Sequence, residues 1–439
     1  MINRKLIYKV LGQLLFIEAF LLFVSLLVAF YYQQDDIFAF IVATLTTIGG
    51  GLVLKWRGHG ADNSMSRRDA YLVVTLSWIV FSFFGTLPFM ISGYINNFTD
   101  AYFETMSGFT TTGATILDDV ECFPHGLLFW RSLTQWIGGL GIVFFTIACI
   151  ASYYVAGMNL FDSFNYAMTT TATGGFSTHN SSTSFFHSPA LEYICAFFCF
   201  LSGVNFTLLY AAVIKFKIKD LFKNSEFKFY MLLVTAFTAF IMVELIAMRN
   251  YDVEHAFRSA IFQVVSFITT TGLFNDDAAV WPHVTWVVLA ACMFFGACSG
   301  STSGGLKCIR GVMLVRMVKN EFRQILHPNA VLPLKIDGVN VPMQKRVTLL
   351  AFLTTYLIIC LVISFTMIAM GIDNTNAITI TLSCVGNVGP TLGTEIGPTM
   401  SWSELPDVAK WFCSLMMLIG RLEIFSVLVI LTPAFWREN

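Results

Sequence analysis

The sequence predicts an all-α polytopic membrane protein, in which a leading helix hairpin is followed by four repeats around one central axis. Composition is the first reason: 56% of the 439 residues are hydrophobic and only 12% are charged, whereas a soluble domain carries ~25% charged residues. Second, apolar runs of the ~20 residues that a membrane helix needs recur along the chain. Third, a short string that ends in glycine occurs four times.

The first two apolar runs, at 6–30 and 37–54, form the predicted hairpin. Basic residues precede the first run, and others follow the second at Lys55, Arg57, Arg67 and Arg68. Positive residues mark the cytoplasmic side of a membrane protein, so both ends of the hairpin are predicted to be cytoplasmic. Residues 1–69 are therefore predicted to form an N-terminal transmembrane hairpin with its cytoplasmic loop.

Each later repeat is predicted to contain a span, a short helix, a glycine string and a second span. In the first repeat these are a span at 70–91, a short helix at 98–108, the string, and a returning span at 125–150. The short helix cannot cross a bilayer, so it is predicted to be re-entrant. The predicted repeats occupy residues 70–157, 158–228, 229–345 and 346–439, with further apolar runs at 189–214, 229–248, 281–315, 347–370 and 408–432.

The strings read Thr-Thr-Thr-Gly at 110–113 and 269–272, Thr-Ala-Thr-Gly at 171–174, and Gly-Asn-Val-Gly at 386–389. Fourfold repetition indicates a repeated architecture and disfavours the alternative of ordinary helix-ending turns. Glycine lets the backbone turn its carbonyl oxygens toward an axis, where they can replace the water around a dehydrated monovalent cation. A cation selectivity filter is therefore predicted at Thr111, Thr112, Gly113, Thr173, Gly174, Thr270, Thr271, Gly272, Asn387, Val388 and Gly389.

Each short helix is predicted to be a pore helix that directs its C-terminal partial negative charge toward the cavity, where it attracts a cation. With one central glycine per string, the filter offers few ordered carbonyls. We therefore expect incomplete discrimination among monovalent cations, so that some sodium passes. Acidic residues after the first string, Asp118, Asp119 and Glu121, either concentrate cations at the outer mouth or belong to a solvated loop.

The second repeat is shorter than the others. Its glycine lies 61 positions after that of the first string, whereas the next two intervals are 98 and 117 positions (Gly113, Gly174, Gly272 and Gly389). Three crossings are predicted between the cytoplasmic loops at 55–68 and 215–228, although two cytoplasmic ends require an even number. One outward helix is therefore predicted to be missing between residues 150 and 158, and the chain is expected to fold poorly and to conduct little.

Residues 296–305 are rich in glycine and serine and interrupt an apolar run that would otherwise form one long helix. They predict either a close-packed helix crossing or an unwound loop that blocks the pore beneath the filter. Arg421 lies inside the last apolar run, where a charge is costly. It is predicted either to face the pore and this loop or to form an interhelical salt bridge. The predicted gate comprises Gly300, Ser301, Thr302, Ser303, Gly304, Gly305, Lys307 and Arg421.

Six stretches, at 107–115, 135–139, 174–179, 300–307, 327–331 and 420–422, resemble the Trk/Ktr/HKT superfamily of potassium transporters, most closely the membrane subunit of bacterial Trk systems. The resemblance implies that Gly113, Gly174, Gly272 and Gly389 are the central filter glycines. It also implies potassium as substrate, bound at these glycines, without a covalently bound cofactor, a multi-pass location in the bacterial cytoplasmic (inner) membrane, a homodimer, and a cytosolic nucleotide-binding regulatory subunit. No nucleic-acid partner is expected.

Three other functions remain open alternatives. The shortened second repeat is compatible with a truncated paralogue that does not conduct. A secondary solute transporter with broken helices is disfavoured, because such proteins show inverted repeats whereas these run in the same sense. An intramembrane serine protease is suggested only by Ala-Cys-Ser-Gly at 297–300, and a serine nucleophile needs a base within hydrogen-bond reach.

Overall fold

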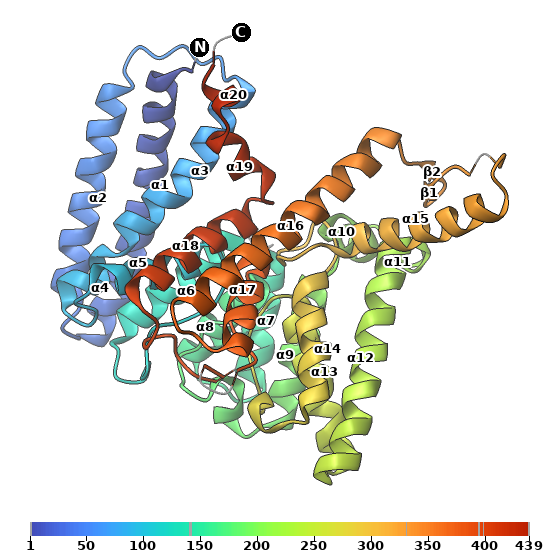
Figure 1. Cartoon of the computed structure of the whole chain (residues 1–439). Helices are drawn as coiled ribbons and strands as arrows, with labels where there is room; N and C mark the ends of the chain where they lie inside the picture. Colours follow the sequence, from blue (N-terminus) through green and yellow to red (C-terminus); the bar gives the residue numbers. More distant parts are fainter. Residues whose placement is uncertain (1, 140–142, 331, 394–395, 398, 438–439) are drawn as a thin grey trace.

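The computed structural model describes residues 2–139, 143–330, 332–393, 396–397 and 399–437, which are predominantly helical (Figure 1). Both chain termini lie on one side, here called the N-terminal face, and the other side is called the opposite face. Within these ranges, five helical segments are long and apolar enough to cross a membrane: α1 (Arg4–Tyr32), α2 (Ile37–Arg57), α3 with α4 (Arg67–Gly85 and Leu87–Ser92), α12 (Ser225–Arg249) and α16 (Met343–Ala369). The protein is therefore a multi-pass membrane protein.

The leading hairpin is formed by α1 and α2, which pack closely along their lengths. Small residues make this approach possible, because a Cβ added at Gly12 would lie 2.9 Å from the carbonyl oxygen of Gly51. Helix α3 begins at a capping box in which Ser66 and Asp69 each accept a hydrogen bond from the backbone of the other. The bounds of α1, α2 and α3 agree with the apolar runs in the sequence.

Four short helices of 12, 12, 16 and 13 residues occupy equivalent places in the chain: α5 (Phe98–Phe109), α8 (Leu160–Thr171), α13 (Val253–Ile268) and α17 (Asn374–Gly386). Each begins with an asparagine or aspartate whose side chain accepts a hydrogen bond from a backbone N–H of the first turn: Asn97, Asn159, Asp252 and Asp373. All four are too short to cross a bilayer.

Each short helix is followed by a second helix that begins at a proline and stops early. These helices are α6 (His125–Gly139), α9 (Pro189–Ser202), α14 (His283–Phe295) and α18 (Asp407–Arg421). A glycine occurs 14 positions after the starting proline in all four, pairing Pro124 with Gly138, Pro189 with Gly203, Pro282 with Gly296 and Pro406 with Gly420. At 1.5 Å per residue, helices of 13–15 residues are about 20 Å long, which is less than the ~30 Å of a bilayer core.

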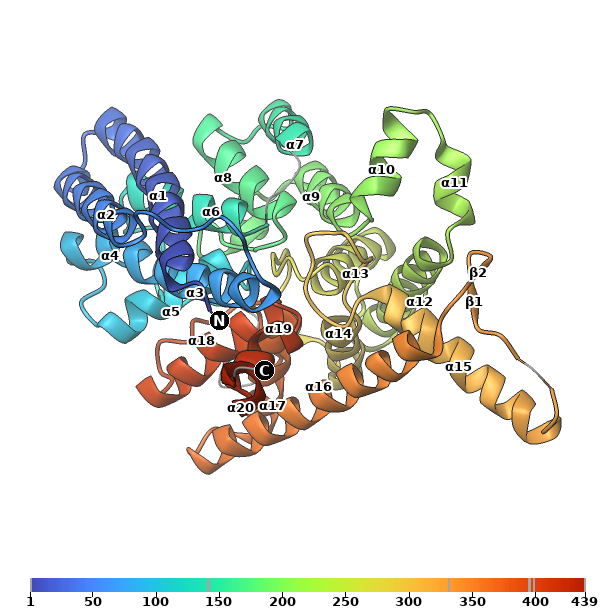
Figure 2. The ribbon, with the colours of Figure 1, turned by 90° about the horizontal axis from the view of Figure 1, so that it is seen from above.

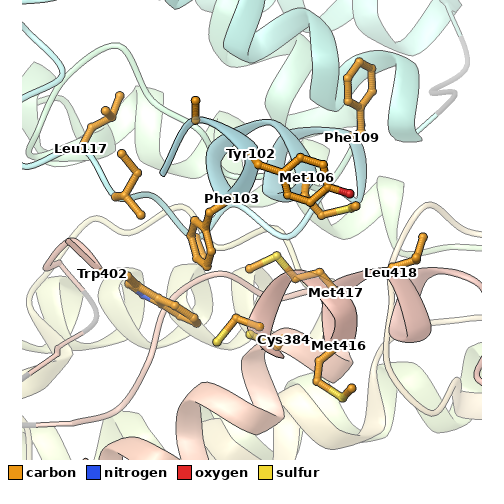
Figure 3. Close-up of a cluster of buried hydrophobic side chains, with 14 of the residues drawn as sticks. Tyr102, Phe103, Met106, Phe109, Leu117, Cys384, Trp402, Met416, Met417 and Leu418 are labelled. Atoms are coloured by element: carbon orange, nitrogen blue, oxygen red, sulfur yellow. The ribbon is translucent and has the colours of Figure 1, made fainter. Parts of the chain in front are cut away.

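The four units close into a ring. The second helix of each unit packs against the short helix of the next: α6 on α8, α9 on α13, α14 on α17, and α18 on α5. Figure 3 shows the last of these contacts, where Phe103 and Met106 of α5 face Trp402 and Met417. Seen from above, the second helices surround the centre of the molecule, while α1 and α2 lie to one side (Figure 2). This closure makes the fold circular rather than open-ended.

The predicted spans at 125–150, 189–214 and 408–432 are not single helices, whereas the run at 281–315 is interrupted as predicted. After its break, α9 bends by 109° into α10 (Phe206–Val213), and α18 bends by 117° into α19 (Phe425–Leu431). After α14 the chain is non-helical until α15 (Cys308–Leu326). The glycine at each break weakens the helix there. The remaining elements are η1 (Ser182–Phe186), α11 (Ile218–Lys223), η2 (Ala278–Val280), β1 (Lys335–Ile336), β2 (Val339–Asn340) and α20 (Pro433–Trp436).

The missing-helix prediction also needs correction. His125, at the start of α6, stacks on Tyr32 with ring centroids 4.0 Å apart, and Phe161, at the start of α8, lies 5.5 Å from the same ring. Because Tyr32 ends α1 far from the N-terminal face, α6 and α8 both begin at the opposite face. The chain between them therefore enters along α6 and returns along α7 (Val143–Val155).

The reversal between α6 and α7 removes the discrepancy in the number of predicted crossings, because two half-length helices stand where two full spans would be. Residues 140–142, between α6 and α7, lie outside the described residues. Hydrogen bonds join the three helices across the reversal: the Trp136 indole N–H donates to the Thr146 hydroxyl at 3.1 Å, which bonds the Thr171 hydroxyl at 3.0 Å. The ring-forming helices α6 of the first repeat and α8 of the second are thus both retained in this shorter chain.

Candidate functional site

The centre of the ring is formed by four glycine loops, defined as residues 110–114, 172–176, 269–273 and 386–390. Each loop ends its short helix in the same way. The backbone N–H groups of Thr112, Gly174, Thr271 and Val388 donate to the carbonyl five residues earlier, at 2.8–2.9 Å. This hydrogen bond is typical of a Schellman-type helix end. Because it occurs in every loop, it shows which residues of the four loops are equivalent.

The residue before each of these donors adopts the left-handed conformation, with φ of 54°, 55°, 56° and 54° at Thr111, Thr173, Thr270 and Asn387. A β-branched residue seldom adopts this conformation. Such strain, of about 1–3 kcal/mol per residue, concentrates at functional sites, where the surrounding structure enforces it. The same backbone outlier therefore marks the four loops as one constellation.

Two positions further on, each loop has a glycine with positive φ: Gly113, Gly175, Gly272 and Gly389, at 81°, 82°, 79° and 98°. The structure corrects the register predicted for the second string, because the equivalent of Gly113 is Gly175 and not Gly174. Gly174 takes the place of Thr112. The misassignment arose because the sequence has two adjacent glycines and only the backbone conformation distinguishes them.

These four glycines are in contact around a closed cycle. A Cβ added at Gly113 would lie less than 3.0 Å from the carbonyl oxygen of Gly174 in the next loop. The same holds for Gly175 with Thr271, for Gly272 with Val388, and for Gly389 with Thr112, which returns to the first loop. Glycine is thus required at each position by both conformation and space. The predicted residues of all four strings are brought together.

The loops are held by different side chains. In the first and third, threonine hydroxyls pair within the loop, Thr110 with Thr112 at 2.8 Å and Thr269 with Thr271 at 2.7 Å. In the fourth, the Asn387 amide donates to the Thr112 hydroxyl and to the Met417 carbonyl, both at 2.9 Å. The second loop lacks such a pair, since its corresponding residues are Ala172 and Gly174.

A cavity of about 100 Å³ opens on the opposite face of the ring and is lined by Gly113, Gly175, Gly272 and Gly389. Its wall contains Arg131, whose Nε donates to Glu104 of α5 at 2.8 Å, in an ion pair that is almost completely buried. Glu104 also accepts from the backbone N–H of Ile116 at 3.0 Å. This pair fixes the chain that leaves the first loop. We did not predict it, since its members lie on separate helices.

The acidic segment after the first loop contributes to this cavity only in part. Asp118 lines it and accepts a hydrogen bond from Ser403 at 2.7 Å. Asp119 accepts from the Asn180 amide at 2.8 Å, and this bond holds the pKa of the Asp119 carboxyl below its ordinary value. Glu121 lies 3.5 Å from His179. Asp118 thus joins the segment after the first loop to the fourth repeat, whereas Asp119 and Glu121 join it to the second.

On the N-terminal side of the ring, the loop 296–307 lies against the third and fourth glycine loops and against the end of α8. The Gly304 N–H donates to the Thr270 hydroxyl at 2.8 Å, and Gly304 packs on the Gly386 carbonyl. The Thr302 hydroxyl donates to the Thr171 carbonyl at 3.4 Å. The alternative of a continuous close-packed helix at 296–305 is therefore wrong, because the backbone here is unwound and buried in protein.

Glu226, at the start of α12, holds both ends of this loop. It accepts from the Ser299 N–H at 2.6 Å and from the Ile309 N–H at 2.9 Å. The Ser299 hydroxyl donates to Glu226 at 3.0 Å. That hydroxyl therefore has a carboxylate partner rather than the histidine base that a serine protease would use.

Arg421 joins the loop to the first repeat. Its guanidinium donates to the Thr302 carbonyl at 3.0 Å and to the Gly138 carbonyl in the last turn of α6. Its neighbour Glu423 pairs instead with Arg310 at 2.5 Å. Lys307 donates to the Ser303 carbonyl within the loop. Arg421 thus contacts the loop from the last repeat, and Lys307 bonds within it. Among the described residues, no cluster of His, Cys, Asp and Glu could hold a metal ion.

Apolar spans around a closed ring of four short helices and glycine loops define a polytopic membrane protein of the ion-transport class. A family model described as "TrkH: Cation transport protein" matches residues 35–153 and 140–437. The chain belongs to this TrkH family.

Curated relatives agree over the whole chain. The "Trk system potassium uptake protein TrkH" of Halomonas elongata is 32% identical over 99% of this chain and 100% of its own length. The protein of the same description from Escherichia coli (strain K12) is 32% identical over 98% of this chain and 99% of its own. The crystal structure of the potassium transporter TrkH from Vibrio parahaemolyticus superimposes with a TM-score of 0.94, at 32% identity and 99% coverage of both chains.

The comparison also locates the shortening. The alignment with the Halomonas protein has 484 positions. This chain fills about 435 of them, which is 99% of its 439 residues. About 49 positions therefore have no residue here. The two segments matched by the family model overlap at 140–153, where α6 gives way to α7. The chain is thus shorter than these relatives while matching them nearly from end to end.

Proposed function

We propose that this protein mediates potassium uptake across the bacterial cytoplasmic membrane through a single pore at the centre of the ring, and that it also passes some sodium. The observation that carries this proposal is the closed cycle in which Gly113, Gly175, Gly272 and Gly389 each contact a carbonyl of the next loop. A cycle of four backbone segments can surround a monovalent cation and replace its water. The names of the relatives supply the ion, since they are potassium uptake proteins.

The four glycine loops are the proposed selectivity filter, in the register of Gly175 for the second loop. The short helices that precede them are the proposed pore helices. Each ends at its loop, so the partial negative charge of four helix C-termini converges on the ring and favours a cation there. In this proposal the repeats comprise residues 70–157, 158–228, 229–345 and 346–439 after the hairpin 1–69.

The loop 296–307 and Arg421 form the proposed gate. The loop contacts the N-terminal side of the third and fourth glycine loops and the last residue of α8, and Arg421 contributes a positive charge beside it, which opposes the passage of a cation. We further propose a homodimer with a cytosolic nucleotide-binding regulatory subunit, on the resemblance to Trk systems. The N-terminal face is the cytoplasmic one in this proposal, because the basic loops lie there.

The alternative of a truncated, non-conducting paralogue is less well supported. The break after α6 falls where the other second helices also stop, so the shortening leaves α6, α8 and the second glycine loop in the ring. We therefore expect the 439-residue chain itself to conduct.

Purified protein in liposomes is expected to take up potassium and rubidium faster than sodium. The flux is measured with radioactive rubidium and sodium in parallel, and restoration of growth is measured in a bacterium that lacks potassium uptake. Empty liposomes and a Gly272→Asp variant, which places a charged side chain into the ring, are the controls. Equal rates for lithium, sodium and potassium would exclude a potassium-selective filter, and absence of growth at wild-type expression would favour the non-conducting paralogue.

The reversal between α6 and α7 predicts where single cysteines are labelled. Ser181→Cys, after the second loop, is expected to react with a membrane-impermeant maleimide from outside intact cells, and Asn63→Cys only after the cells are opened. Both positions are exposed. The variants are made in a Cys122→Ser background, since Cys122 is an exposed free thiol. Labelling of Ser181→Cys only from inside would mean that the second repeat has the reverse orientation.

A further inference from the structure

Gln135 of α6 holds the backbone of the second glycine loop by two hydrogen bonds. Its amide Nε2 donates to the Gly174 carbonyl at 2.7 Å, and its Oε1 accepts from the Phe176 N–H at 3.0 Å. The two backbone partners fix the orientation of the carboxamide, since a carbonyl only accepts and an N–H only donates. Gln135 is fully buried. It therefore clamps the loop on both sides of Gly175, the residue that contacts the third loop.

This clamp replaces side chains that the second loop lacks. The place of Gly174 is taken by Thr112, Thr271 and Val388 in the other loops, and a Cβ at Gly174 would lie less than 3.0 Å from the Gln135 carboxamide. Gln135 itself lies 11 positions after the starting proline, where the other second helices have Phe200, Met293 and Met417. A polar side chain at this position thus occurs only where the next loop has a glycine to admit it.

We propose that Gln135 is a selectivity-determining positioning residue, which orders the peptides flanking Gly175 so that the second loop matches the other three. The proposal rests on the proposed filter. Buried carbonyl and N–H groups that lose their partner reorient or recruit water. A loop that rotates in this way no longer offers the fixed carbonyl geometry that distinguishes potassium from sodium. Loss of the clamp should therefore alter ion discrimination more than total flux.

The first test is Gln135→Met, which introduces the residue found at the equivalent positions of α14 and α18. In liposomes we expect the ratio of rubidium to sodium uptake to fall about tenfold, with most of the change in sodium uptake. Gln263→Met is the matched control, since Gln263 is also fully buried but its amide donates to the Asp276 carbonyl and not to a residue of a glycine loop. An unchanged ratio in Gln135→Met, with a selective wild type, would refute the role of Gln135. A wild type without selectivity would instead refute the proposed filter.

A second variant tests the hydrogen bonds themselves. In Gln135→Glu, a protonated carboxyl keeps a donor for the Gly174 carbonyl, whereas the carboxylate has none. Selectivity is expected to be near that of the wild type at low pH and to fall as the pH rises and the proton is lost. The wild-type ratio over the same pH range is the reference. A packing role alone would give a flat profile in Gln135→Glu, and that result would overturn the proposal.

Two alanine variants distinguish the role of Gln135 in filling space from its role in hydrogen bonding. Gly174→Ala is expected to block flux because its Cβ meets Gln135. Gln135→Ala with Gly174→Ala removes this clash, so flux should return while the rubidium-to-sodium ratio stays low, because the clamp is still absent. Recovery of the wild-type ratio in the double variant would show that Gln135 only fills space. Monodispersity in size-exclusion chromatography confirms that each variant is folded.

Discussion

Replacing Gly175 with alanine is expected to reduce potassium uptake below about a tenth of the wild-type rate, because the change strains the backbone and closes the ring. Gly175 has φ of 82°, where a Cβ costs about 1–2 kcal/mol. In addition, that Cβ would lie less than 3.0 Å from the Thr271 carbonyl oxygen. The neighbouring loop cannot give way without disturbing its own contact with Val388, so the effect spreads around the ring.

Gly93→Ala is the matched control, since Gly93 has φ of 78° but open space around it. Rubidium uptake and thermal stability are measured for both variants. The control should lose some stability and keep its flux. The register is tested by adding Gln135→Ala, which should rescue Gly174→Ala but not Gly175→Ala, because only the former meets a side chain. Rescue of Gly175→Ala, or normal flux in it, would place the central position elsewhere.

Deleting residues 298–304 is expected to raise potassium flux severalfold, because it removes the segment that lies against the glycine loops. The deletion is structurally feasible, since Gly296 and Gly305 pack against each other and leave the new ends close together. Arg421→Ala should also raise flux, through loss of the loop contact at Thr302 and of a positive charge. Liposome flux at matched protein content measures both.

A double-mutant cycle tests whether the loop and Arg421 act together, in which case the combined effect is less than additive. Arg421→Lys separates charge from geometry, because lysine keeps the charge without the planar fork that reaches both carbonyls. Arg316→Ala, which removes a positive charge from α15 away from the loop, should leave flux unchanged. Lower flux in Arg421→Ala at normal expression would contradict the proposed gate.

The break after α6 has a feature in common with the breaks after the other second helices. All four stop about 20 Å into the protein, and a helix that ends there leaves carbonyl groups that need partners. In α6 one of these, Gly138, accepts from Arg421. The end of α6 therefore has a protein partner at this carbonyl, as helix ends inside a membrane require.

Local features of the sequence determined the class of protein, the four repeats and the place of the unwound loop. Apolar runs specify α1, α2, α12 and α16, since a bilayer-length helix satisfies its own backbone hydrogen bonds. The strings after α5, α8, α13 and α17 could be recognised because a glycine ends a helix locally. The glycines at 296–305 indicated the break after α14 for the same reason.

Only the tertiary structure decided the register of the second loop, the reversal at α6 and α7, and the residues that hold the ring. Gly174 and Gly175 are indistinguishable in sequence, and the contact of Gly175 with Thr271 separates them. Counting crossings failed because it assumed complete spans. A helix can stop inside the membrane only if another element satisfies its end, and for α6 that partner is Arg421, 283 positions away in the chain.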